Sequence, residues 1–243
     1  MKKTYAKEAL SLSVNSNFLH CVVYRRLSRF TSPLSISQRG RSMIEMLGVL
    51  AIIGVLSVGG IAGYSKAMEK FKINKTIEQI AQIAANVKTL YAQQTTFAGL
   101  NNSSAISMGI IPSELGTNGN DLINAFGGNI YVQNNQYVIH DGTFSIEFRQ
   151  LTKASCVALA TADWGTISAS GVVGIIFGHL AEPDTYVNAL TKTCVGEGAV
   201  GPYTYMACSG SLPLSPAIAS SFCKDPSSVD NPREYGFAIK YTK

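Results

Sequence analysis

Several residues of this chain have the types that catalysis or ligand binding requires, but not the spacing. Gly196–Gly201 matches the G-x-G-x-x-G pattern of dinucleotide sites, which needs a preceding strand and a helix that starts inside the motif. Here Pro202 follows at once, so we interpret the segment as a glycine-rich loop. His140, His179 and Asp163 are too dispersed to indicate a triad or a metal site. We therefore expect no catalytic residue, no metal and no cofactor.

The cysteines suggest covalent cross-links rather than chemistry. Four of the five lie in the last 90 or so residues, and no two have C-x-x-C spacing. Two disulfides formed in an oxidising compartment are the favoured interpretation, and four buried free thiols are the alternative. Four cysteines allow three pairings, and spacing alone does not choose among them. The four cysteines are Cys156, Cys194, Cys208 and Cys223.

One carboxylate, Glu45, lies inside an almost wholly apolar run over residues 43–63. A helix of this length spans about 30 Å, which is the thickness of the hydrocarbon core of a bilayer. The run therefore predicts a membrane-spanning helix. Gly59 and Gly63 have the spacing at which small residues let two helices approach closely in lipid.

The same helix is predicted to continue well beyond the apolar run. Residues 64–94 contain no Pro and no Gly, and apolar side chains recur there at steps of three and four. This pattern indicates an amphipathic half over 64–96, which follows the span at 41–63. The whole helix would be about 54 residues long, or ~80 Å. The predicted stripe consists of Ile73, Ile77, Ile80, Ala84, Val87 and Tyr91.

Residues 97–243 have the pattern of a globular α+β domain packed against that helix. Strand-like segments at 129–133, 136–140 and 143–149 are separated by Asn-Asn and Asp-Gly, which favour hairpin turns, and predict a three-stranded antiparallel meander. The remaining elements are predicted as helices over 153–162, 183–190 and 215–222 and strands over 172–177 and 234–241.

The formal charge of +5 is concentrated at the beginning of the chain. Residues 1–40 carry a net charge of +6, so residues 41–243 carry −1. The body of the protein therefore lacks the basic surface that nucleic-acid binding requires, and no nucleic-acid partner is expected.

The segment Gly40-Arg41-Ser42-Met43-Ile44-Glu45-Met46-Leu47 resembles the processing site of type IV prepilins. In that family a glycine precedes the cut and a glutamate is the fifth mature residue. The long leader over 1–40 and the long helix resemble the type IVb subclass. Two segments, "FSIEFRQLTKASCVALA" and "PLSPAIASSFC", are similar to the conjugation-type (thin-pilus) type IVb pilins. The first mature residue of the family is usually apolar, and here it would be Arg41.

The resemblance implies a structural subunit and not an enzyme. A prepilin peptidase would remove residues 1–40 by cutting after Gly40 and would methylate the new amine of Arg41. An assembly ATPase and an inner-membrane platform protein would then build a helical homopolymer with the helices in its core. The chain would be a single-pass inner-membrane protein with a periplasmic C-terminal domain, and later part of an extracellular pilus used for adhesion, conjugation or motility.

The resemblance also implies roles for particular residues. Glu45 would pair in the fibre core with the α-amine of Arg41 of a neighbouring subunit, or with the Arg41 guanidinium. The pair Cys156–Cys223 matches the C-terminal disulfide loop of the family, and Cys194–Cys208 is favoured as the second pair. Closing the shorter loop would contribute about 3 kcal/mol in the chain-entropy model.

Two other functions remain open from the sequence. A pseudopilin of a type II secretion system would share the N-terminal pattern, although two disulfides and a body of about 150 residues favour a pilin. A membrane-anchored periplasmic enzyme or binding protein is the second alternative, and it would not need Gly40 or Glu45.

Overall fold

The computed structural model describes residues 43–134, 142–165, 167–180, 194, 196–201, 203–224 and 235–243. The proposed cleavage residues Gly40 and Arg41 lie outside these ranges, as do the strand expected over 136–140 and the helix expected over 183–190.

Helix α2 (Met43–Leu90) is 48 residues long. It ends at Leu90, before the end of the amphipathic half that was expected over 64–96. The amide of Tyr91 still donates to the carbonyl of Val87 at 3.0 Å, but Gln94 donates to Tyr91 in a tighter turn. This turn brings Phe97 back onto Tyr91, with 5.4 Å between the ring centroids. Tertiary packing therefore ends a helix that lacks a sequence stop signal.

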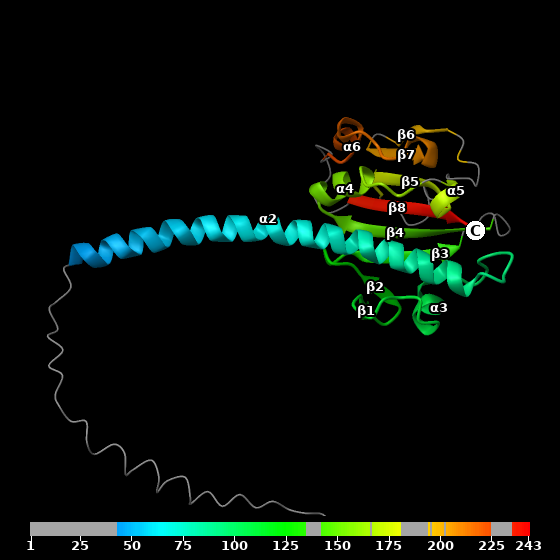
Figure 1. The fold of residues 1–243 in the computed structure, drawn as a ribbon, viewed down its shortest axis with the longest axis horizontal. Coiled ribbons are helices and arrows are strands. Elements are labelled where there is room, and N and C mark those ends of the chain that lie inside the picture. Colours follow the sequence, from blue (N-terminus) through cyan, green and yellow to red (C-terminus); the bar gives the residue numbers. More distant parts are fainter. Residues whose placement is uncertain are drawn as a thin grey trace, which may run out of the picture. The chain divides into compact units, whose positions relative to one another are not determined.

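The described strands form one antiparallel sheet of eight, in the order β1-β2-β3-β4-β8-β5-β7-β6 (Figure 1). The three central strands, β4, β8 and β5, are buried along almost their whole length. The strands are β1 (Gly116–Asn118), β2 (Asp121–Ile123), β3 (Asn129–Asn134), β4 (Thr143–Leu151), β5 (Val172–His179), β6 (Gly198–Gly201), β7 (Thr204–Cys208) and β8 (Tyr235–Thr242).

The prediction of a three-stranded meander is wrong, because the strand at 129–134 lies directly beside the strand at 143–151. Strand β3 pairs directly with β4 in antiparallel register, from Ile130 opposite Phe148 to Asn134 opposite Phe144. In a meander, the first and third strands would instead run parallel to each other. The direct pairing places Ile130 and Phe148 in the same core, where both are fully buried.

Short helices flank the sheet, and two of them begin at a capping side chain. Thr152 caps α4 by accepting a hydrogen bond from the Ser155 amide at 3.2 Å, and Ser215 caps α6 with Pro216 at its first turn. These helices and turns are α3 (Asn102–Ser107), α4 (Lys153–Ala160), α5 (Ile167–Ser170), the 3₁₀ turn η2 (Ser209–Ser211) and α6 (Pro216–Phe222).

The main hydrophobic core lies between the second half of α2 and the sheet (Figure 1). Ile80, Ile83 and Val87 of α2 are fully buried against it, together with Phe144 and Phe237 from the central strands. The protein is therefore an α+β fold, in which a long N-terminal helix packs on an antiparallel sheet.

Candidate functional site

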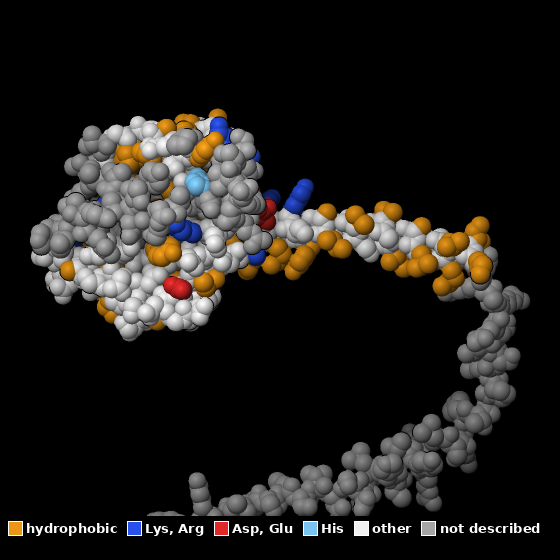
Figure 2. Space-filling model, turned by 180° about the vertical axis from the view of Figure 1, so that it is seen from behind, with side chains coloured by type: hydrophobic (Ala, Val, Ile, Leu, Met, Phe, Trp, Pro, Cys, Tyr) orange, Lys and Arg blue, Asp and Glu red, His pale blue; other side chains and the backbone are white. Residues whose placement is uncertain are grey.

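The first half of α2 is an exposed apolar surface. All of its large hydrophobic side chains are at least 45% exposed. The exposed fraction ranges from 45% at Met46 to 87% at Met43. Figure 2 shows hydrophobic side chains gathered along this part of the helix. Among the described residues, α2 contains the single segment that is long and apolar enough to cross a bilayer, with a mean hydropathy of 2.2. An apolar surface of this extent is typical of a site that contacts lipid or other protein.

Glu45 lies in the first turn of α2. An acidic side chain there interacts favourably with the positive end of the helix dipole. Within the part of the chain that the structure describes, Glu45 forms no ion pair. Burial of the apolar surface around Glu45 would therefore require a cation to accompany this carboxylate.

Gly59 and Gly63 lie one turn apart on α2. A Cβ atom placed on either glycine would meet no atom within 4 Å. Neither backbone needs the left-handed conformations that only glycine adopts easily, so folding of this copy does not require a glycine at these positions. The small side chains leave room for a second helix to approach.

The second half of α2 has a buried stripe that differs slightly from the predicted one. Ile80, Ala84, Val87 and Tyr91 are buried, whereas Ile77 packs at the edge of the core and Ile73 is half-buried. The centre of the buried face also includes residues that the periodicity argument omitted, namely Thr76, Gln79 and Ile83. Ile83 has the right spacing from Ile80 and Val87, so the same argument applied to every apolar residue would have found it.

Polar groups fix this half of the helix to the globular domain. The Asn86 amide donates to the carbonyl of Ile110 at 2.7 Å. Lys88 donates to the carbonyl of Ser170, and its ammonium lies 5.1 Å from the centre of the Tyr241 ring. Burial lowers the pKa of Lys88. Contacts so far apart in sequence give no local signal that a sequence argument can use.

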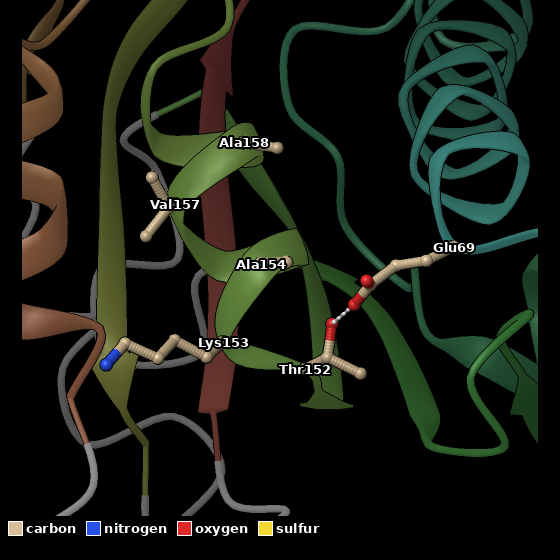
Figure 3. A pocket seen from close by; sticks show the side chains of 6 residues that line it. All are labelled: Glu69, Thr152, Lys153, Ala154, Val157 and Ala158. Carbon is tan, nitrogen blue, oxygen red and sulfur yellow. Dashed lines mark hydrogen bonds between the residues drawn. The ribbon is translucent and has the colours of Figure 1, made fainter. Parts of the chain in front are cut away.

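A groove separates α2 from α4. The Thr152 hydroxyl donates to the Glu69 carboxylate at 2.9 Å, and this hydrogen bond joins the two helices at one end of the groove (Figure 3). Ala154 and Ala158 of α4 line it beside Glu69. Thr152 both caps α4 and holds Glu69, so the position of α4 is linked to that of α2.

Two disulfides join segments of the globular domain. Cys156 of α4 is linked to Cys223 at the end of α6, and both residues are fully buried. Cys194 is linked to Cys208 at the end of β7. These are the two pairs that the resemblance favours. The first disulfide cross-links α4, the helix whose cap contacts Glu69.

The glycine-rich segment does not have the structure of a dinucleotide site. Residues Gly198–Gly201 form β6, which pairs with β7, so no helix starts inside the motif. His179 is the last residue of β5, while His140 lies outside the described residues. No cluster of His, Cys, Asp or Glu able to hold a metal ion occurs among the residues with described positions.

Comparisons with known proteins agree with this arrangement. The model of the PilS N-terminal family matches residues 70–197, more than half of the chain. The chain is 30% identical over 137 residues to the "major structural subunit of bundle-forming pilus" of Escherichia coli O111:H-, covering 55% of this chain and 69% of that protein. It is 28% identical over 164 residues to the protein of the same name from Escherichia coli O127:H6 (strain E2348/69 / EPEC), covering 63% of this chain and 83% of the relative.

A crystal structure of a type IV b pilin from Salmonella typhi aligns with 67% of this chain and 95% of its own, at 16% identity and a TM-score of 0.40. The family match and the two pilus subunits identify the family of this chain. The relatives are structural proteins and not enzymes. The chain belongs to the PilS N-terminal family and is a type IVb pilin, a structural subunit of a pilus.

Proposed function

We propose that this chain is a type IVb prepilin that is cut between Gly40 and Arg41. A prepilin peptidase removes the leader over residues 1–40 and methylates the new α-amine of Arg41. An assembly ATPase then acts through an inner-membrane platform protein to move the mature subunits into a helical fibre. Residues 41–63 serve first as the membrane anchor and then as part of the fibre core.

The observation that carries this proposal is the exposed apolar half of α2. Its large side chains are uncovered in the single copy, while the second half of α2 and the described sheet share a buried hydrophobic core. Hydrocarbon can cover this surface before assembly, and the same half of neighbouring subunits can cover it in a fibre. Gly59 and Gly63 allow close approach between such helices, since no described residue fills the space beside them.

Glu45 gives the assembled state its register. A charged side chain deep in lipid costs about 3 kcal/mol on insertion scales, so an unpaired Glu45 opposes burial of this turn. In the fibre, the methylated amine of Arg41 on a neighbour, or the Arg41 guanidinium, supplies the missing cation. Such a buried pair contributes little net stability, but every subunit position that leaves Glu45 unpaired is penalised.

The two disulfides support a periplasmic position for the globular domain before assembly. Disulfides form and persist in oxidising compartments such as the bacterial periplasm. Both cross-links lie in the domain that follows α2, at Cys156–Cys223 and Cys194–Cys208. The domain would then face outward in an extracellular fibre that serves adhesion, conjugation or motility.

N-terminal sequencing and intact mass of the mature protein test the processing step. The expected chain begins at Arg41 and carries one added methyl group. A mature protein that keeps residues 1–40 would contradict the proposal.

A second experiment tests the role of Glu45 in the fibre. Glu45→Ala is expected to be processed normally but to yield little fibre, as measured by shearing fibres from cells and quantifying the subunit. Glu78→Ala is the matched control, because Glu78 is an exposed glutamate on the second half of the same helix. Wild-type fibre yield from Glu45→Ala would refute the assigned role.

A further inference from the structure

We propose that the groove between α2 and α4 holds the headgroup of an anionic phospholipid while the subunit is anchored in the membrane. This inference rests on the proposed membrane-anchored precursor and adds a specific ligand to it. The ligand is a phosphodiester lipid of the bilayer, held by the ammonium groups of Lys66 and Lys70.

The groove has a polar edge and an apolar floor. Its α2 side is formed by Lys66, Glu69, Lys70, Ile73 and Asn74, which follow the spacing of a single helix face. Its α4 side is formed by Ala154 and Ala158, also four residues apart. Because these α4 side chains are single methyl groups, the two helices leave a groove of about 520 Å³ between them.

The contacts around the groove leave two cations available. Among the described residues, Lys66 and Lys70 form no ion pair, and both are exposed. The other two lysines of this region are engaged elsewhere: Lys72 lies 5.6 Å from the centre of the Phe126 ring, and Lys75 pairs with Glu78 and Glu114.

The carboxylate in the groove is occupied by a protein donor. Glu69 accepts a hydrogen bond from the Thr152 hydroxyl at 2.9 Å, as Figure 3 shows. Lys153 points away from this contact, so it is not counted as a ligand. The two lysines together with Glu69 leave a net charge of +1 on the α2 side, which is complementary to one phosphodiester.

The two lysines of the groove also lie at the level of the lipid headgroups when the apolar run spans the bilayer. Gly63 ends the apolar run, and a rise of 1.5 Å per residue places Lys66 about 4–5 Å and Lys70 about 10 Å beyond it. The headgroup layer is roughly 5–8 Å thick on each side of the hydrocarbon. Side chains of a helix lean toward its N-terminus, which here means toward the bilayer, so both ammonium groups reach the phosphate layer.

Lipid retention by the full-length protein tests the proposal. The protein is reconstituted into nanodiscs containing equal amounts of phosphatidylethanolamine and phosphatidylglycerol, and native mass spectrometry counts the lipids that stay bound. We expect one phosphatidylglycerol per wild-type chain. Lys66→Gln/Lys70→Gln should lower the affinity for this lipid about 30-fold, because each juxtamembrane lysine contributes a factor of about five.

Two further variants separate the groove from general surface charge. Lys72→Gln/Lys75→Gln removes the same charge from the same helix outside the groove, and it should retain the lipid within about threefold of wild type. Ala154→Phe fills the groove without changing its charge and should also lose the lipid. Unchanged thermal unfolding of the globular domain in each variant shows that the change is local.

Three outcomes would overturn the inference. The first is an equal loss of bound lipid from Lys66→Gln/Lys70→Gln and from Lys72→Gln/Lys75→Gln. The second is equal retention of phosphatidylethanolamine and phosphatidylglycerol by the wild-type chain. The third is a wild-type chain that binds a second copy of itself instead of lipid and loses that copy in Lys66→Gln/Lys70→Gln. Resistance of the wild-type chain to alkaline extraction is measured in parallel. A chain that is extracted contradicts the membrane-anchored precursor itself, whereas an inserted chain without lipid selectivity contradicts the groove alone.

Discussion

The two halves of helix α2 share one secondary structure, but the large hydrophobic side chains of the first half are exposed, whereas a stripe of those in the second half is buried. In the first half, residues 43–63, every large hydrophobic side chain is exposed. In the second half, residues 64–90, the stripe through Ile80, Ile83 and Val87 is fully buried against the sheet. The second half is thus stabilised by its own globular domain, whereas the first half requires lipid or other subunits to cover it.

This difference predicts that substitutions in the two halves have separate consequences. Changes in the second half should affect folding of the globular domain, because their partners belong to the same chain. Changes in the first half should leave that domain folded and should affect membrane insertion or fibre formation instead.

The largest expected effect comes from truncating a buried isoleucine of the second half. Ile83→Ala should lower the free energy of unfolding by roughly 2–5 kcal/mol, because it removes fully buried methyl groups and leaves a cavity. Ile61→Ala is the matched control in the first half, where the side chain is 67% exposed. Denaturant unfolding of the detergent-solubilised protein, followed by Trp164 fluorescence, measures both. Similar losses from the two variants would contradict the comparison.

Removing the smaller disulfide should have the next largest effect. Cys194→Ala/Cys208→Ala opens a 15-residue loop, with a sequence separation of 14, and should cost about 3 kcal/mol. The same unfolding assay measures this loss, while alkaline extraction of membranes should show unchanged anchoring by the first half of α2. Reduced anchoring in this variant would mean that the two halves are not independent.

A smaller effect is expected from the polar contact between Asn86 and the carbonyl of Ile110. Asn86→Ala removes this 2.7 Å hydrogen bond and should lower the free energy of unfolding by about 1 kcal/mol. Gln82→Ala, one turn earlier and exposed, provides the control and should be nearly neutral. A cost for Gln82→Ala as large as that for Asn86→Ala would show that helix propensity, rather than the contact, determines the result.

The sequence predicted the elements whose signals are local. The helix repeat predicted α2, and the helices expected over 153–162 and 215–222 correspond to α4 and α6. Burial of Ile80 and Val87 follows from the same repeat. These features depend only on residues within a few turns of one another.

The errors arose where long-range pairing decides the structure. Strands β1 and β2 have three residues each, which is too short for alternation to be recognised, and the glycines of β6 favour a loop when only the local sequence is considered. The order of β3 and β4 depends on which strand pairs with which, and turn residues alone did not settle it. The contact from Glu69 to Thr152 joins residues 83 positions apart, so no local pattern indicates the groove.

The smallest expected effect is the pH dependence of the contribution of Lys88 to stability. Lys88 lies near the end of the second half of α2. Two contacts favour its charged form, namely the Ser170 carbonyl and the Tyr241 ring, but desolvation outweighs them and the pKa of Lys88 is lowered. Between this lowered pKa and the ordinary value near 10.5, the unfolded chain binds more protons than the folded chain. The contribution of Lys88 to stability should therefore become more favourable as the pH rises through that window.

The measurement must isolate Lys88 from the tyrosines, which act in the opposite direction. Burial raises the pKa of Tyr91 and of Tyr241, so ionisation of these phenols in the unfolded chain lowers stability above about pH 10. Below pH 10 these phenols remain largely protonated in both states, so they contribute little to the difference between the melting temperatures of the wild type and Lys88→Met. Between pH 8 and pH 10, the difference should shift in favour of the wild type by a few degrees at most. A constant difference across this range would mean that the Lys88 ammonium is as well solvated in the folded protein as in the unfolded chain.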